Sequence, residues 1–121
     1  MDEYYIAGAR EPAKTRSDFL YINFGVCLLN LKKLRDDKLD DKIITALNER
    51  HWEANEQDVF NKFCQGKIYE FSSCYNANAF CLPTKDKKIW HFAGEKHWQH
   101  FPIVGYYNRT PLTELKRKKK Q

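Results

Sequence analysis

The sequence feature that most constrains the fold is the run from Phe19 to Leu31. Its segment from Val26 to Leu29 is apolar at every position, which is typical of a strand covered on both faces. Asn23 and Gly25 stand just before this segment. An asparagine amide offers both a donor and an acceptor, and a glycine permits a tight turn or the close approach of a ligand. Taken alone, these residues are best interpreted as a turn that leads into a core strand.

Strand-like and helical patterns alternate along the rest of the chain. Apolar runs at residues 4–9 and 67–71 predict strands, and a third run, at residues 89–91, ends on a histidine. The polar segment from Arg10 to Asp18 contains Pro12 and predicts a surface loop. With 121 residues, of which 42% are hydrophobic, the chain is expected to be one domain, or part of one, with a single core.

A helical pattern follows Leu31. Four apolar residues recur at helical spacing, so one face of the helix is expected to pack on the sheet, while four aspartates stay solvated at the helix start. The apolar residues are Leu39, Ile43, Ile44 and Leu47, and the acidic ones are Asp36, Asp37, Asp40 and Asp41. We interpret the aspartates as charges that complement the helix dipole and not as a metal site, because no histidine lies nearby.

A second helix is predicted between Asn55, a suitable N-cap with Asp58 three residues later, and Gly66, a suitable C-terminal stop. Its apolar stripe consists of Val59, Phe60, Phe63 and Cys64. Glu56 and Gln57 in the first turn fit a plain helix start, but they also fit a binding site. A carboxylate and an amide can hydrogen-bond the hydroxyls of a sugar, and an amide oxygen can face a developing cation without losing a proton.

His91 is a candidate site residue because it ends the run Ile89-Trp90-His91. Gly94, Lys96 and Trp98 follow it. A strand fixes the side chain at its end, and the following loop leaves room for a ligand. A lone histidine between aromatic residues is nevertheless more often a packing residue than a ligand, so this stretch alone leaves both interpretations open.

The positive charge of the chain is concentrated at its carboxy terminus. The formal net charge is +5, and Lys116 to Lys120 hold five of the 21 basic residues, so the other 16 are matched by 16 acidic side chains. A neutral body whose aromatic residues are not interleaved with basic ones argues against a nucleic-acid partner. The tail fits a solvated end, or attraction to an anionic membrane surface at about 1 kcal/mol per residue. Thr110 and Pro111 before it can start a short basic helix.

The four cysteines do not have the spacing of a zinc knuckle, and no secretory signal or membrane-spanning apolar run is apparent. Cys27, Cys64, Cys74 and Cys81 are therefore expected to be reduced thiols, with Cys27 and Cys64 on apolar faces. We expect a cytoplasmic protein that the basic tail could hold at the periphery of a membrane.

Three motifs together support a more specific hypothesis. They are Asn23-x-Gly25-Val26, Glu56-Gln57-Asp58, and His91-Phe92-Ala93-Gly94 with its following lysine and tryptophan. In their order and spacing, the motifs resemble the carboxy-terminal half of the family 8 retaining glycosyltransferases. The resemblance runs from about Tyr21 to Trp98, with a weaker echo at residues 4–10.

The resemblance implies an α/β fold of the GT-A type, in which a mixed sheet between helices binds a nucleotide sugar. It implies hexosyl transfer from a UDP-sugar to a sugar or glycan hydroxyl with retention. By this resemblance Gln57 and Glu56 are catalytic, Asn23 and Asp58 bind the donor sugar, Gly94 and Lys96 bind the diphosphate, and His91 is a ligand of Mn²⁺. The chain departs from the family pattern where Glu56 replaces an aspartate and where Phe24 replaces a small residue.

One expected feature is absent from the sequence. Nowhere in the 121 residues do two aspartates stand one residue apart, whereas the family pairs its metal-binding histidine with an Asp-x-Asp motif. We therefore expect residues 1–107 to be the distal part of a GT-A domain that lacks its donor-binding half and is inactive alone. Residues 108–121 are expected to form the basic tail. The alternative is a non-catalytic carbohydrate-binding or interaction remnant of the same fold.

Overall fold

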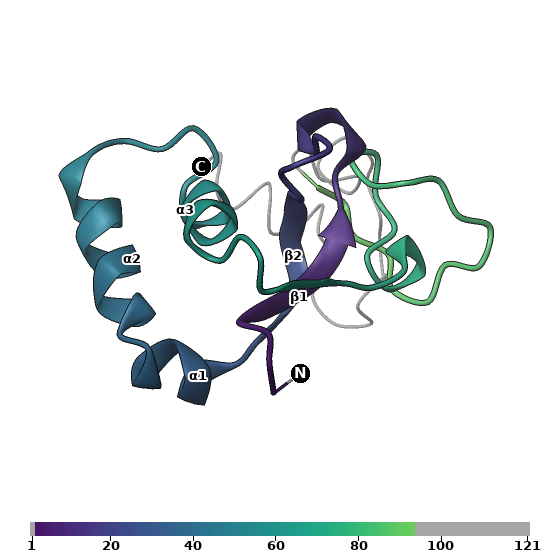
Figure 1. Cartoon of the computed structure of the whole chain (residues 1–121). Helices are drawn as coiled ribbons and strands as arrows, with labels where there is room; N and C mark the ends of the chain where they lie inside the picture. Colours follow the sequence, from purple (N-terminus) through teal and green to yellow (C-terminus); the bar gives the residue numbers. More distant parts are fainter. Residues whose placement is uncertain (1, 94–121) are drawn as a thin grey trace, which may run out of the picture. The chain divides into compact units, whose positions relative to one another are not determined.

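The structure is a computed structural model in which residues 2–93 are described. The strands are β1 (Ile6–Arg10), β2 (Ile22–Leu29) and β3 (Ile68–Glu70), and the helices are α1 (Leu31–Asp36), α2 (Leu39–Glu49) and α3 (Glu56–Phe63) (Figure 1). Two short 3₁₀ turns, η1 (Pro12–Lys14) and η2 (Ser73–Tyr75), lie in the connections. The strands predicted at residues 4–9 and 67–71 are confirmed with shifted bounds, as are both predicted helical regions. The strand predicted at Val26–Leu29 begins earlier, at Ile22, so Asn23 and Gly25 lie within β2 and not in a turn before it.

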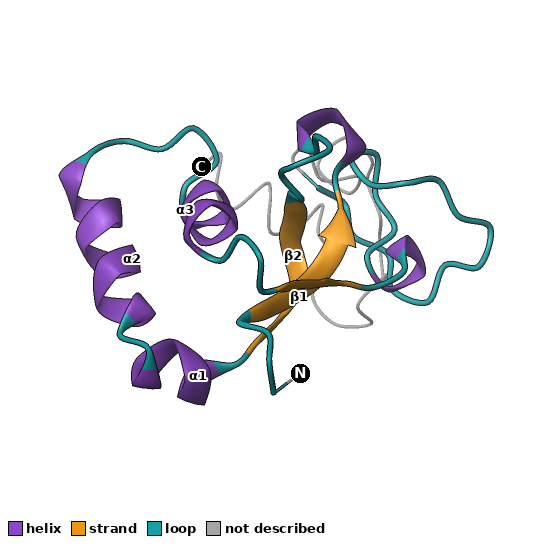
Figure 2. Cartoon of the chain, in the orientation of Figure 1, coloured by secondary structure: helices purple, strands orange, loops and turns teal. Residues whose placement is uncertain are grey.

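The strands form one mixed sheet in the order β2-β1-β3 (Figure 2). β1 is antiparallel to β2 and parallel to β3. The register between β1 and β2 shifts between Gly8 and Ala9, so the middle of β2 bulges out of the ladder. A mixed sheet with flanking helices confirms the expected α/β class and is consistent with part of a GT-A fold.

The core lies between the sheet and the helices, which lie on one side of it in Figure 1. Its buried side chains come from all three strands and all three helices, or directly follow them, and include Ile6, Ile22, Leu34, Ile43, Val59, Cys64 and Ile68.

All four cysteines are free thiols, and burial raises the pKa of Cys64 to about 12. The expectation of reduced thiols is therefore confirmed.

The buried face of α2 differs from the predicted one. Leu39, Ile43 and Ala46 are buried, but Ile44 is 57% exposed and Leu47 is 37% exposed. Lys38 has a left-handed backbone (φ 57°) that ends α1 and restarts the chain as α2 at Leu39. The stripe at Leu39, Ile43 and Ala46 is one helical face, so the two other apolar residues lie on its flank.

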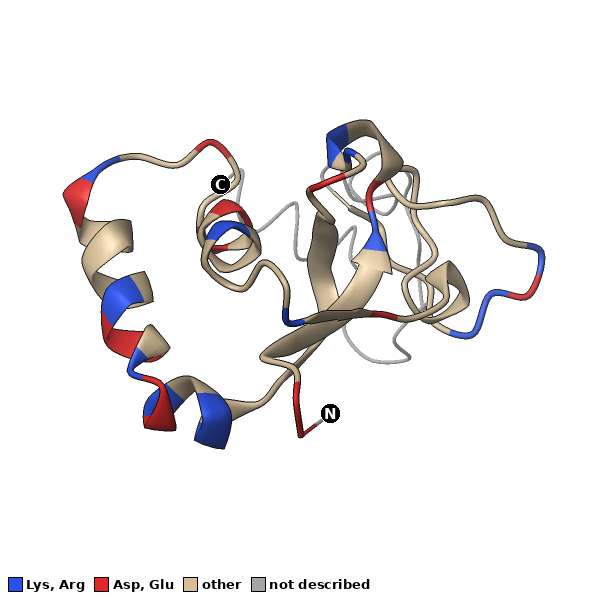
Figure 3. Ribbon diagram, viewed as in Figure 1, with Lys and Arg blue, Asp and Glu red and all other residues tan. Residues whose placement is uncertain are grey.

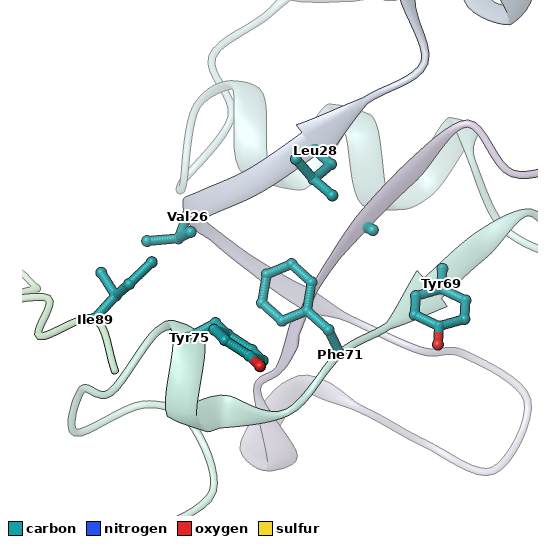
Figure 4. A pocket seen from close by; sticks show the side chains of 7 residues that line it. Val26, Leu28, Tyr69, Phe71, Tyr75 and Ile89 are labelled. Carbon is teal, nitrogen blue, oxygen red and sulfur yellow. The ribbon is translucent and has the colours of Figure 1, made fainter. Parts of the chain in front are cut away.

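The prediction that β2 is covered on both faces is wrong for the part of the chain that the structure describes. Leu28 is 56% exposed and Leu29 is 39% exposed. The helices cover one face of the sheet, and the opposite face carries an apolar hollow of about 400 Å³ (Figure 4). Its lining includes Val26, Leu28, Tyr69, Phe71, Tyr75 and Ile89.

Three local predictions also need correction. Residues 89–91 do not form a strand, because Trp90 makes a single isolated bridge to Ala77. Asn55 does not cap α3 with its side chain, which makes no capping hydrogen bond, and its backbone has a positive φ of 51°. The segment after Arg10 is only partly a surface loop, because Glu11 is 3% exposed.

α3 ends at Phe63 with Cys64 as its C-cap, and Gly66, the predicted stop, follows two residues after that cap with a φ of 86°. None of the helices in residues 2–93 has the length and apolar content needed to span a bilayer. Gly94, Lys96 and the tail from residue 108 lie outside the described residues.

Candidate functional site

The site begins where β2 starts, at the buried amide of Asn23. Its Nδ2 donates to Glu11 Oε2 at 2.7 Å, and its Oδ1 accepts from the backbone N–H of Gly25 at 2.8 Å. The same Oδ1 accepts from Asn76 Nδ2 at 2.8 Å. Asn23 is therefore held by three partners. Both the donor and the acceptor of its amide, Nδ2 and Oδ1, are bonded to other groups of the protein.

Gln57 approaches the same carboxylate from the first turn of α3. Its Nε2 donates to Glu11 Oε2 at 3.0 Å and to the Tyr21 hydroxyl at 3.0 Å. Its Oε1 accepts from the Phe24 backbone N–H at 2.8 Å. Both amide protons are used, and the amide oxygen keeps one lone pair for a further interaction.

Asp58 stabilises this arrangement through Tyr21. The Tyr21 hydroxyl donates to Asp58 Oδ1 at 2.5 Å, and Asp58 Oδ2 accepts from the Ala54 N–H at 3.0 Å. Burial, followed by the bond to Asp58, raises the pKa of Tyr21 well above its usual value. Burial tends to raise the pKa of Asp58, but the bonds from Tyr21 and Ala54 outweigh it and lower this pKa. Asp58 is thus an ionised acceptor at neutral pH.

His91 joins the site through Asn76. The distance from His91 Nδ1 to Asn76 Oδ1 is 2.9 Å, and Asn76 is fully buried. Because Asn76 Nδ2 donates to Asn23, its Oδ1 must be the atom that faces the ring, so His91 Nδ1 carries the proton. In the neutral tautomer the lone pair is then on Nε2, which is the form in which an imidazole binds a metal.

Gly25 is required for this position of the imidazole. A Cβ atom added at residue 25 would lie 1.9 Å from His91 Cε1 and 2.3 Å from Nδ1. Real Cβ atoms do not approach other atoms so closely, so the glycine is needed because the His91 ring fills the space beside it. The close approach that the sequence predicted at this glycine is made by the protein's own histidine.

These bonds connect four of the seven predicted site residues. The order of the network is His91, Asn76, Asn23, Glu11, Gln57, Tyr21 and Asp58. Glu56 is exposed at the start of α3 and has no bond in this network. Gly94 and Lys96 lie outside the described residues.

Sequence reasoning missed three residues of the network, Glu11, Tyr21 and Asn76. Glu11 directly follows the buried strand β1 and precedes Pro12, a place where a carboxylate is held by the strand that carries it. Asn76 lies in a polar loop that had no feature to rank it above Asn78. Glu11 and Asn76 both bond to Asn23, so their roles depend on how their segments pack against β2 and not on a local pattern.

The described residues do not by themselves fit a manganese site. Within residues 2–93 no group of three or more His, Cys, Asp or Glu side chains lies together. His91 offers one suitable nitrogen, whereas Mn²⁺ takes several imidazole or carboxylate ligands. The carboxylates nearest in the network, Glu11 and Asp58, are already bonded to amide and hydroxyl groups.

Comparison with known families gives one match. The model of the family described as "Glycosyl transferase family 8" matches residues 9–101. This range contains every residue of the network as well as Gly94 and Lys96. No curated protein and no solved structure matches the chain.

Proposed function

The chain belongs to glycosyl transferase family 8, and from this premise we propose that it is the distal part of a retaining glycosyltransferase of the GT-A type. The proposed reaction moves a hexosyl group from a UDP-sugar to a hydroxyl of a sugar or glycan. In this proposal residues 1–107 are the distal part of the GT-A domain, and residues 108–121 are the basic tail. The donor-binding half, with its Asp-x-Asp motif, is not in this sequence, so we propose that the chain alone is inactive.

The observation that carries the proposal is the hydrogen-bonded network from His91 to Asp58. It unites residues from three separate family motifs, represented by Asn23, Gln57 and His91. Asn23 and Gln57 are 34 positions apart in the sequence, and so are Gln57 and His91. Packing alone does not require a buried carboxylate such as Glu11 to be bonded only by amides. A carboxylate held beside Gln57 suits a site in which the anomeric carbon of a sugar gains positive charge.

In this proposal each residue has a role that its contacts permit. Gln57 presents the remaining lone pair of its Oε1 toward the anomeric carbon, and Asn23 with Asp58 holds the surroundings of the donor sugar. Glu56, exposed beside Gln57, is available to a hydroxyl of the substrate. Gly94 and Lys96 bind the diphosphate, where an ammonium group offsets the charge of the leaving group.

The proposed cofactor is Mn²⁺, with His91 Nε2 as one ligand. When bound, a divalent cation offsets the charge of the leaving diphosphate. The remaining ligands would have to come from outside residues 2–93. Asn76 contributes by fixing the imidazole in the tautomer that keeps the lone pair on Nε2.

The first test is the size of the native polypeptide in its source cells, detected with an antibody against the carboxy-terminal segment. A product larger by roughly 100–150 residues, a domain's worth, supports a donor-binding half in the same polypeptide. A product of 14.5 kDa directs the search to a second chain that complements this one.

The catalytic test uses whichever native form this experiment identifies. With UDP-hexoses and Mn²⁺, Gln57→Ala is expected to lower kcat by about a hundredfold, as for loss of a group that stabilises transition-state charge. Asn48→Ala, an exposed change on α2, is the matched control. His91→Ala is expected to abolish the dependence on Mn²⁺. Inversion at the anomeric carbon, seen by NMR of the first product formed, would contradict the proposal.

A second candidate is a non-catalytic carbohydrate-binding remnant of the fold. It is favoured by the saturation of Gln57, whose two amide protons are both donated to protein groups. Glycan binding that needs neither nucleotide nor metal, together with no turnover in the native form, would support this candidate over the transferase.

A further inference from the structure

The loop between Asn76 and His91 has an unusual surface. Residues 78–90, which we call the basic loop, leave η2 and project away from the sheet before returning to His91 (Figure 1). Four of its large apolar side chains are exposed: Phe80 by 54%, Leu82 by 46%, Ile89 by 42% and Trp90 by 62%. Single exposed apolar residues are ordinary, but four in one short loop require a reason.

The loop is held in place at its base. The N–H of Ala77 donates to the Ile89 carbonyl at 2.8 Å, and the N–H groups of Lys88 and Ile89 donate to the Cys74 carbonyl at 2.7 and 3.0 Å. Cys81 is buried, and its Sγ accepts from Asn78 Nδ2 at 3.3 Å. The exposed apolar side chains therefore belong to a fixed structure, and their exposure is a property of the fold.

Positive charge lies at the far turn of the same loop. Lys85, Asp86, Lys87 and Lys88 give it a net charge of +2, and Figure 3 shows these charges together at the tip. Lys87 Nζ lies 4.7 Å from the centre of the Trp90 ring, so an ammonium and an aromatic ring are presented side by side. The only carboxylate of the turn, Asp86, pairs with Lys88 at 3.3 Å.

We propose that the basic loop docks on the surface of an anionic phospholipid bilayer. Its lysines would contact the head groups, and Trp90, Phe80 and Leu82 would enter the boundary between head groups and acyl chains. Tryptophan prefers this boundary, and lysine side chains extend from apolar surroundings to the charged layer. The proposal is independent of the transferase activity, because none of these residues belongs to the site network.

The composition of the loop favours a bilayer over other polyanions. A nucleic acid is bound by cations interleaved with flat groups that stack on bases, often including arginine. The loop has no arginine, and the branched side chains of Leu82 and Ile89 have no flat face for a base. A bilayer, in contrast, takes up aliphatic and aromatic side chains together with lysines.

The test is sedimentation of the full chain with vesicles of phosphatidylcholine, with and without a third of phosphatidylserine. The variant Lys85→Gln/Lys87→Gln/Lys88→Gln removes three charges and is expected to weaken binding to the anionic vesicles by about a hundredfold. Each lysine contributes about 1 kcal/mol near such a surface, and the affinity falls about tenfold for each 1.4 kcal/mol lost. The matched control is Lys32→Gln/Lys38→Gln/Lys42→Gln, which removes three exposed lysines from α1, α2 and the turn between them. It should bind within about threefold of the unmodified chain, because these residues lie on other elements.

The tail and the loop are separated by repeating both measurements with Lys116 to Lys120 changed to glutamine. The loop variant should lower binding in both backgrounds. If only the tail changes matter, or if binding is equal on neutral and anionic vesicles, the proposal is wrong. Loss of binding to an oligonucleotide in the loop variant, with vesicle binding unchanged, would also overturn it in favour of a nucleic acid.

Insertion of the apolar side chains is tested by fluorescence. Brominated acyl chains should quench the unmodified chain more than Trp90→Phe, and the difference reports Trp90 at the boundary. Phe80→Ser/Leu82→Ser should lower binding about tenfold while the chain stays folded, because both side chains are already exposed. Equal quenching of the two proteins would show that Trp90 stays in water and would contradict the proposed docking.

Discussion

At the scale of single residues, the carboxylate of Glu11 decides how Asn23 and Gln57 are held. One oxygen, Oε2, accepts from both amides, at 2.7 and 3.0 Å. The two amides come from β2 and α3, so a single carboxylate aligns a strand with the start of a helix. Hydrogen bonds to a carboxylate are stronger than those between neutral groups, and loss of the acceptor leaves the two amide donors without a partner.

We predict that Glu11→Ala lowers the free energy of unfolding by about 3 kcal/mol, since two amide donors lose their acceptor. Glu11→Gln should cost about 1 kcal/mol, because its amide oxygen can still accept from one or both neighbours. Urea denaturation followed by circular dichroism measures both. The exposed residue Glu53 provides the control, Glu53→Ala, which should change stability by less than about 0.5 kcal/mol. Equal effects at residues 11 and 53 would refute this account.

Asp58 adds a pH dependence at the same scale. Its pKa is lowered in the folded chain, from a usual value of 3.8, because the bonds from Tyr21 and Ala54 outweigh the effect of burial. A carboxyl with a lowered pKa contributes stability above its unfolded pKa and loses that contribution as the pH falls through the folded value.

We therefore predict that the wild-type chain is more stable than Asp58→Asn near neutral pH, and that the difference shrinks as the pH falls below 3.8. Urea denaturation of both proteins across this range measures the difference. Asp18→Asn, at an exposed residue, controls for removal of one negative charge. A difference that stays constant down to the lowest pH would mean that the Tyr21 and Ala54 bonds do not favour the ionised form.

At the scale of elements, α3 serves β2 as a substitute for a neighbouring strand. Asn61 Oδ1 accepts from the Ile22 N–H at 2.8 Å, and Asn61 Nδ2 donates to the Ile22 carbonyl at 2.9 Å. One turn earlier, Gln57 Oε1 accepts from the Phe24 N–H at 2.8 Å. Two amides from one helix face thus take up backbone groups at the start of a strand that would otherwise be buried without partners.

The prediction for this contact is that Asn61→Ala lowers the free energy of unfolding by about 3 kcal/mol, since it leaves the Ile22 N–H and carbonyl buried without partners. Hydrogen exchange at the Ile22 amide should also become faster. Asn48→Ala is the control, because Asn48 is exposed and bonds only within its own helix, to the Ile44 carbonyl. Unchanged protection of the Ile22 amide would show that the Asn61 bonds do not hold β2.

The elements also show what sequence patterns can and cannot predict. The strand at Ile22–Leu29 and the helix at Glu56–Phe63 follow from apolar runs and turn residues that are local in the sequence. The role of Glu11 does not, because it depends on Asn23 and Gln57, which are 12 and 46 positions away. Patterns therefore predicted the segments that the hydrogen-bonded network joins, while the residues that connect those segments required the packing.

At the scale of the whole described part of the chain, the sheet is covered by helices on one face and presents an apolar hollow on the other. The continuous apolar run in β2 predicted that both faces of the strand are covered. The expected burial of Leu28 was wrong, because the helices of residues 2–93 cover only one face of the sheet. A run of apolar residues therefore indicated correctly that both faces are apolar, but it could not indicate what lies against them.

The exposed face leads to the last prediction, which concerns dye binding by the native protein. The hollow is lined by side chains such as Val26, Leu28 and Tyr69, and exposed apolar surface of this size binds anilinonaphthalene sulfonate. Leu28→Thr/Tyr69→Thr should lower the fluorescence of the bound dye severalfold. The free energy of unfolding should change by only about 1 kcal/mol, because both side chains are at least half exposed and threonine suits a strand.

Leu31→Thr is the matched control for the hollow, since Leu31 is 55% exposed but lies on α1 and does not line it. It should leave the dye signal unchanged. Dye fluorescence that falls equally in both variants would place the bound dye elsewhere, and a native chain that does not bind the dye would mean that the apolar face is covered in solution. Dye fluorescence thus distinguishes a sheet whose apolar face is open to solvent from one whose face is covered, and this measurement does not depend on catalytic activity.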